Sequence, residues 1–87
     1  MYQEYKPYVY DLQSRFGSRL KKYCRENKLT QEQFAEILDV DPRHLSRWMN
    51  GVSLPNITSL LRICRCTGLS ADYLIGRGED YGEDSGD

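Results

Sequence analysis

Apolar residues recur at helical spacing along most of this 87-residue chain. In the first third, Leu12, Phe16, Leu20 and Tyr23 follow one another at intervals of three or four residues. Such a stripe covers one face of an α-helix, so it predicts an amphipathic helix that begins near residues 8–11. The same period later in the chain predicts an all-α fold of five helices.

Four shorter helices are predicted by signals at their own ends. They span residues 31–38, residues 42–49, a stretch between Asn56 and Gly68, and a stretch between Ser70 and Gly76. Thr30 and Gln33 have the spacing of a capping box, in which each side chain bonds the other residue's backbone. Asp41 before Pro42 is a typical helix start, and Asn50-Gly51 is a typical stop. Because only two or three residues separate the first two of these helices, they must cross steeply, which predicts a helix-turn-helix.

The later helices extend the predicted core. In the fourth helix, the residues expected to face the core are Ile57, Leu60, Leu61 and Cys64. In the fifth helix, Leu69 and Leu74 have the spacing of a hydrophobic staple around the cap Ser70. One modest core is what a chain of this length can bury.

Several segments together carry a resemblance to a known family. They are LTQEQFAEILDV from Leu29, LSRW from Leu45, the following Asn50-Gly51, Pro55, LLRIC from Leu60, and GLSADYLIG from Gly68. This set resembles the Cro-type, lambda-repressor-like helix-turn-helix family of bacterial and phage transcriptional regulators, from about Phe16 to Gly76. The resemblance implies a compact five-helix DNA-binding domain whose helix-turn-helix is formed by the second and third helices.

The chain departs from the family pattern at three positions. The positions of Cys24 and Met49 commonly hold an arginine and a glutamate that form a buried ion pair in the family. Both are apolar here, and since exchanging both partners of such a pair can be neutral, we expect Cys24 and Met49 to be in contact. Asp39 replaces a glycine whose backbone is left-handed. Aspartate tolerates that conformation better than most residues, so we expect the turn to be kept.

The predicted helix 42–49 has two chemically different faces. Its core face holds Leu45, Trp48 and Met49, and the residues on the opposite face are Arg43, Ser46, Arg47 and Asn50. The base-reading positions that the resemblance implies are Pro42, Arg43, His44 and Arg47. Arginine in the major groove can bind O6 and N7 of guanine together. Pro42 offers only apolar contact, and His44 is either an exposed reader or half packed.

Phosphate contacts are expected at helix starts, where free N–H groups and the helix dipole favour an anion. The candidates, chiefly implied by the resemblance, are Thr30, Gln31, Ser46 and Asn50. For Gln31 and Asn50, simple capping of a helix end is the alternative. The loop 52–55 carries no lysine or arginine. The basic residues on or beside the outer face of the first helix are either a solvated face or further backbone contacts; they are Arg19, Lys21, Lys22, Arg25 and Lys28.

Charge divides the chain into a domain and an acidic end. The formal net charge is −1. Residues 77–87 hold one arginine against five acidic residues, so the rest of the chain is mildly basic. We predict that 77–87 is a disordered tail, because it is acidic, glycine-rich and poor in apolar residues. Residues 1–10 are predicted to be an extended tyrosine-rich arm, which either covers the core or forms a dimer contact, and 11–76 is the helix-turn-helix domain.

The remaining composition argues against other classes of protein. Cys24, Cys64 and Cys66 lack metal-ligand spacing, so we expect small buried or half-buried residues, although with His44 they supply four ligands on paper. We expect no metal, no cofactor and no disulfide. One histidine, with no paired carboxylates in a plausible cleft and no phosphate-binding glycine loop, predicts neither an enzyme nor a small-molecule substrate. Without a membrane-spanning run or a signal-peptide pattern, we expect a cytoplasmic protein.

Two functions remain open at this point. The first is a sequence-specific DNA-binding transcriptional regulator, with repression as the expected role, that acts as a homodimer on a palindromic stretch of double-stranded DNA. The second is a protein-interaction module of the same fold, antitoxin-like or an anti-repressor partner, with weak DNA binding. The arginines of helix 42–49 favour the first function. The uncharged loop 52–55 and the acidic tail favour the second.

Overall fold

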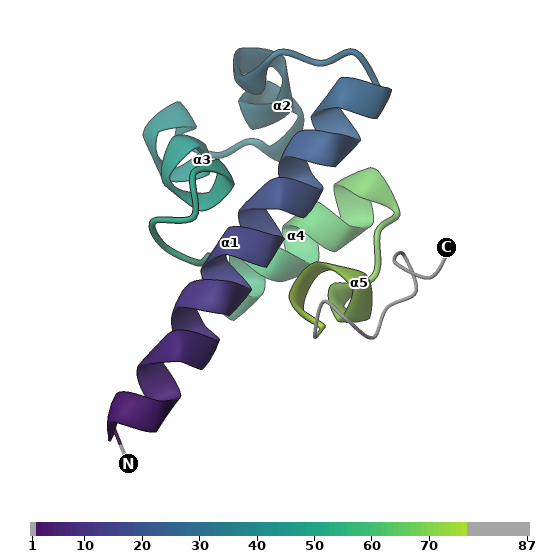
Figure 1. Ribbon diagram of the computed structural model, residues 1–87. Coiled ribbons are helices and arrows are strands. Elements are labelled where there is room, and N and C mark those ends of the chain that lie inside the picture. Colours follow the sequence, from purple (N-terminus) through teal and green to yellow (C-terminus); the bar gives the residue numbers. More distant parts are fainter. Residues whose placement is uncertain (1, 77–87) are drawn as a thin grey trace.

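The computed structural model describes residues 2–76, with side chains from Val9 onward, and this range folds into five helices (Figure 1). They are α1 (Tyr2–Glu26), α2 (Gln31–Leu38), α3 (Pro42–Met49), α4 (Ile57–Thr67) and α5 (Ala71–Ile75). No strand occurs between residues 2 and 76. The all-α prediction is confirmed, and the four shorter helices lie where their end signals placed them.

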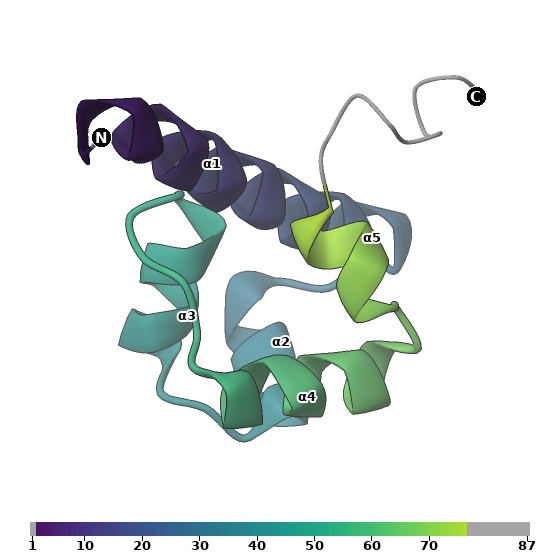
Figure 2. The same ribbon diagram turned by 90° about the horizontal axis from the view of Figure 1, so that it is seen from below.

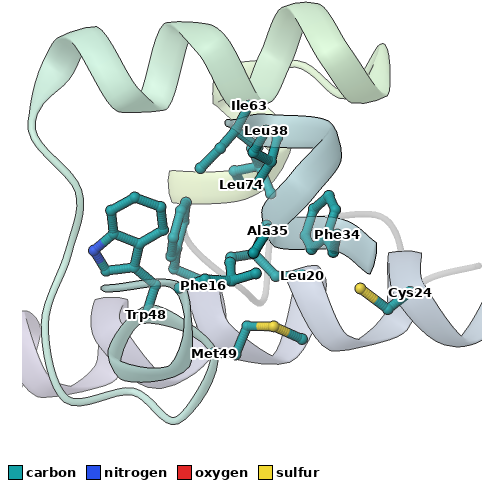
Figure 3. Close-up of a cluster of buried hydrophobic side chains, with 11 residues drawn as sticks. Phe16, Leu20, Cys24, Phe34, Ala35, Leu38, Trp48, Met49, Ile63 and Leu74 are labelled. Carbon is teal, nitrogen blue, oxygen red and sulfur yellow. The ribbon is translucent and has the colours of Figure 1, made fainter. Parts of the chain in front are cut away.

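One buried cluster joins all five helices (Figure 3). Its members are Phe16, Leu20, Cys24, Phe34, Ala35, Leu38, Leu45, Trp48, Met49, Ile63 and Leu74. Every residue assigned to the core from helix 42–49 is among them. Cys24 and Met49 both lie in this cluster, on helices α1 and α3 that pack against each other. Their direct contact stays a prediction.

The beginning of α1 corrects the sequence interpretation. The backbone is helical from Tyr2, so the predicted start near residues 8–11 and the extended arm were both wrong. Pro7 lies inside the helix, where its missing N–H costs one backbone hydrogen bond and does not end the helix. The first turns of α1 project beyond the other helices (Figure 1 and Figure 2).

Helix α4 packs with a different face from the one predicted. Ile57 and Leu61 are 77% and 54% exposed, while Ile63 is fully buried and Leu60 is partly buried against the core. Leu61 lies two residues before Ile63, about 160° around the helix, so both cannot face the core. The expectation for Ile57 and Leu61 was wrong, and α4 leaves apolar surface exposed.

Arg19 is also placed differently from the prediction. It was expected on or beside the outer face of α1, yet it is only 6% exposed. Its guanidinium donates to the carbonyl oxygen of Tyr73 and lies 4.9 Å from the centre of the Tyr73 ring. Nearby, Arg15 donates to the carbonyl oxygen of Gly76. Two arginines of α1 therefore fix the end of α5.

The cysteines and the chain ends complete the description. Cys24 is buried and Cys64 is half-buried, as expected, but Cys66 is exposed. Between residues 2 and 76, no group of three or more His, Cys, Asp or Glu side chains is arranged to hold a metal ion. None of the five helices is long and apolar enough to cross a membrane. The predicted disordered tail, 77–87, lies outside the described residues.

Candidate nucleic-acid interface

The start of α2 carries the predicted capping box. The backbone N–H of Gln33 donates to Oγ1 of Thr30 at 3.0 Å, and the N–H of Thr30 donates to Oε1 of Gln33 at 2.8 Å. Thr30 and Gln31 are both exposed at this helix end. The Thr30 oxygen is therefore engaged as an acceptor, while its hydroxyl hydrogen and the Gln31 amide remain available to an anion.

The turn between α2 and α3 has the geometry expected from the family pattern. Asp39 is left-handed, with φ 57° and ψ 48°. Its backbone N–H donates to the carbonyl oxygen of Glu36 at 3.1 Å, and the N–H of Val40 donates to that of Ala35 at 3.1 Å. These bonds satisfy carbonyls that a helix end otherwise leaves open. An aspartate thus occupies the position where the family usually has glycine.

Arg62 of α4 holds the same turn from outside. Its Nη1 donates to the carbonyl oxygens of Asp39 at 3.0 Å and Leu38 at 3.4 Å. The exposed Cys66, one turn later, places its sulfur 3.7 Å from the carbonyl oxygen of Ile37. A cation at a helix C-terminus also opposes the negative end of the helix dipole. The contact of Arg62 with this turn was not predicted, because no local sequence pattern links an arginine to carbonyl oxygens more than twenty residues away.

Helix α3 begins with the predicted cap. Oδ1 of Asp41 accepts the backbone N–H of Arg43 at 2.8 Å, and Pro42 occupies the first turn, where its missing N–H costs nothing. The helix ends at Met49, with Asn50 as its C-terminal cap and Gly51 at φ 74°. Both ends of α3 are therefore set by residues that the sequence identified.

The same aspartate also binds the side chain of Arg43. Nη2 of Arg43 lies 2.8 Å from Oδ2 of Asp41, and Nε lies 3.2 Å from Oδ1. These hydrogen bonds lower the pKa of Asp41 to about 2 and raise the pKa of Arg43. The Arg43 side chain is nevertheless 87% exposed. Its guanidinium is held at the surface by Asp41.

The other predicted base-reading residues share the exposed side of α3. Pro42, His44 and Arg47 are all exposed, which resolves the open question about His44 in favour of exposure. Within residues 9–76, Arg47 makes no hydrogen bond or ion pair to another side chain. Its fork of donors is therefore directed to solvent, opposite the buried Leu45.

Ser46 and Asn50 form one edge of α3. Nδ2 of Asn50 lies 3.3 Å from Oγ of Ser46, and Asn50 is exposed while Ser46 is partly buried. The predicted phosphate contacts thus fall into two places, the start of α2 and the end of α3. The structure brings Ser46 and Asn50 together and leaves Thr30 and Gln31 as a separate pair.

The position of α3 is fixed by close packing on α1. A Cβ atom at Gly17 would lie 2.7 Å from the carbonyl oxygens of both Trp48 and Met49, closer than real Cβ contacts. Gly17 therefore lets the backbone of α3 approach α1 directly. Any larger residue there must push α3 away, so the orientation of the exposed face depends on this glycine.

These features define the class of protein. Two short helices joined by a tight turn, with the second helix buried on one side and polar and basic on the other, are a helix-turn-helix DNA-binding domain. The family model described as helix-turn-helix matches residues 20–74, more than half of the chain. The chain therefore belongs to the Cro/C1-type helix-turn-helix family of transcriptional regulators.

Two relatives agree with this assignment. The HTH-type transcriptional regulator ImmR of Bacillus subtilis is 32% identical over 63 residues, which cover 72% of this chain and 50% of that protein. The HTH-type transcriptional activator BcrR of Enterococcus faecalis is 35% identical over 60 residues, which cover 69% of this chain and 29% of that protein. The chain thus spans half or less of the length of these relatives. No solved structure gives a significant match.

Proposed function

We propose that this protein is a sequence-specific DNA-binding transcriptional regulator that inserts α3 into the major groove. The observation that carries the proposal is the exposed side of α3, where Arg43, His44 and Arg47 are exposed while Leu45 is fully buried. An α-helix fits the major groove of B-DNA, and base edges there identify each base pair. The membership of this chain in a family of helix-turn-helix transcriptional regulators supports this role for α3.

Arg47 and Arg43 are the proposed main base readers, with His44 and Pro42 beside them. Arg47 has no described side-chain partner to give up, so it can meet guanine O6 and N7 at once. Arg43 exchanges its contact with Asp41 for a base edge, which makes its contribution smaller. Each good bidentate contact is worth about 1–3 kcal/mol of discrimination against a wrong base.

The two ends of the motif are the proposed phosphate contacts. Thr30 and Gln31 at the start of α2 would hold one phosphate group, and Ser46 with Asn50 at the end of α3 would hold another. Such contacts fix the register of a protein on the duplex but carry no sequence information themselves. Together they would keep α3 seated in the groove.

We further propose that two copies bind a palindrome and act as a repressor. One recognition helix with few phosphate contacts reads a short site, whereas a two-fold dimer reads two half-sites about 34 Å apart. A dimer seated on such an operator would repress by occupying the site. The proposed partner is therefore double-stranded DNA together with a second copy of this chain, and no catalytic step is involved.

Selection on a pool of randomised duplexes at low salt tests this function. The expected result is enrichment of a palindrome by the full chain, and its loss in the Arg43→Ala/Arg47→Ala variant. Affinity for the enriched duplex should fall steeply with salt, because binding releases counterions from the phosphates. Absence of enrichment by a folded protein would contradict the proposal.

The second candidate, a protein-interaction module, has two observations in its favour. Ile57 and Leu61 expose apolar surface on α4, and the loop 52–55 has no basic side chain to hold a phosphate. Large exposed apolar residues on one helix face are typical of contact surfaces. If the selection yields no DNA site, a protein partner on this face becomes the better explanation.

A further inference from the structure

A small surface hollow lies where α1 meets the end of α3. It has a volume of about 150 Å³ and is lined by Ser14, Ser18, Lys21, Met49, Asn50 and Gly51. A hollow of this size has room for several water molecules. A phosphate group with its four oxygens is of this order of size.

The lining of the hollow is suited to an anion. Ser14, Ser18 and Lys21 are spaced by four and three residues, so they lie along one face of α1. The lining thus includes two serines and one lysine, and none of the six lining residues is acidic. Hydroxyl and ammonium donors are the groups that commonly bind phosphate oxygens.

Asn50 connects this hollow to the proposed DNA-binding face. It lines the hollow and also contacts Ser46 on the exposed side of α3. Gly51 is held against α1 as well, because a Cβ on it would lie 3.4 Å from Cα of Ser14. The backbone of α1 at Ser14 thus lies directly beside the end of α3.

We propose that this hollow is a phosphate-binding site for the DNA backbone, formed by Ser14, Ser18, Lys21 and Asn50. The inference rests on the proposed function and deepens it, because it adds residues of α1 to the contacts expected at helix ends. It also explains how a domain with an uncharged loop 52–55 holds the backbone next to α3: the cation comes from α1 instead. The site contributes affinity and register, and it does not read bases.

Lys21→Ala is the central test, and Lys22→Ala is its matched control. Lys22 has the same charge one residue away, does not line the hollow, and lies 4.0 Å from Glu26. Affinity is measured for the enriched duplex and for a duplex of mixed sequence between about 50 and 200 mM salt. Thermal denaturation of both variants checks that each is folded.

The Lys21→Ala variant should lose one phosphate contact. The slope of log affinity against log salt should fall in magnitude by about 0.9. The ratio of the affinity of the unsubstituted protein to that of the variant should therefore fall about 3.5-fold between about 50 and 200 mM salt. The loss should be similar on both duplexes, since a phosphate contact weakens binding uniformly across sequences. Lys22→Ala should leave the slope nearly unchanged. Ser18→Glu, which places a carboxylate in the hollow, should weaken binding more than Ser18→Ala.

Two results would overturn the inference, and they are distinguishable. If the unsubstituted protein binds the enriched duplex but Lys21→Ala and Lys22→Ala change the slope equally, the hollow holds no phosphate while the proposed function stands. If the folded, unsubstituted protein binds neither duplex at low salt, the inference and the proposed function fall together.

Discussion

The arginines of α3 differ from three arginines of α1 and α4 in what their guanidinium groups contact. Arg15, Arg19 and Arg62 donate to backbone carbonyls of other segments, namely those of Gly76, Tyr73, Leu38 and Asp39. On α3, Arg43 binds only its own cap, and Arg47 contacts no other described side chain. Arg15, Arg19 and Arg62 therefore connect helices to one another, whereas Arg43 and Arg47 are exposed to solvent.

This difference shows why net charge is a poor guide to the DNA-binding surface here. The chain has 12 basic and 13 acidic residues, which alone suggests no affinity for DNA. Some of the cations are committed to the fold, and the acidic residues after Gly76 lie in sequence outside the domain. What favours DNA is the placement of a few exposed cations on α3 and along α1, rather than their total number.

The largest effect on stability is expected at Arg19. Its replacement by alanine removes a charged hydrogen bond to the Tyr73 carbonyl and the contact with the Tyr73 ring, which together cost about 2–4 kcal/mol of unfolding free energy. The melting temperature should drop by about 10 °C or more. Arg25→Ala, an exposed basic residue on the same helix, is the control and should change stability by less than about 0.5 kcal/mol. Equal melting temperatures for the two variants would contradict the structural role of Arg19.

A smaller effect is expected at Arg62, because the side chain is exposed. Arg62→Ala leaves the carbonyls of Leu38 and Asp39 without their donor, and the expected loss is about 1 kcal/mol. Amide hydrogen exchange should speed up in the turn 39–41 more than in α5. Arg65→Ala, on the same helix but without a described bond to α2, should leave the exchange of that turn unchanged. An unchanged turn in Arg62→Ala would remove Arg62 from the group of structural arginines.

The smallest effect concerns Asp41, and it changes with pH only in acid. Its pKa is about 2 in the folded state, mainly because Arg43 donates to it, against an ordinary value of 3.8. The pair therefore stabilises the fold fully above pH 4, and this contribution is lost as the pH falls through about 2. Asp41→Asn keeps a good cap but loses the charge. Its stability relative to the unsubstituted protein should improve between pH 4 and pH 2, as measured by urea unfolding.

The same comparison in an Arg43→Ala background isolates the pair. There Asp41→Asn should produce a smaller change with pH, since the principal cause of the lowered pKa has been removed. A pH dependence of the same size in both backgrounds would mean that Arg43 is not the cause.

The parts of the fold that sequence predicted are those whose determinants are local. The caps Thr30 and Asp41 act on backbone groups two or three residues away, so the starts of α2 and α3 were readable from a short window. The two faces of α3 followed from the same helical period. The exposure of Arg43 and Arg47 was therefore predictable, whereas that of His44 was left open, and the contacts of these residues with DNA stay proposals.

The parts that sequence missed depend on partners far along the chain. Arg19 meets Tyr73 across 54 residues, and Arg62 meets the α2 end across 24, so neither pairing leaves a local pattern. On α4, Ile57 and Leu61 have helical spacing with the true core residues, and only packing decides which apolar positions turn inward. At the start of α1, the predicted bounds followed the apolar stripe that begins at Leu12, whereas the helix begins at Tyr2.

The most direct test of the account compares dissociation constants for the enriched duplex and for a mixed-sequence duplex at one fixed salt concentration. The proteins are the unsubstituted chain, Arg43→Ala/Arg47→Ala and Arg62→Ala. The double variant should lose discrimination between the duplexes by about 30-fold or more while melting near the normal temperature, because it loses two base contacts. The Arg62→Ala variant should have a lower melting temperature and the same discrimination between the two duplexes as the unsubstituted chain. Retained discrimination in the folded double variant would contradict the claim that the exposed arginines of α3 read the DNA sequence.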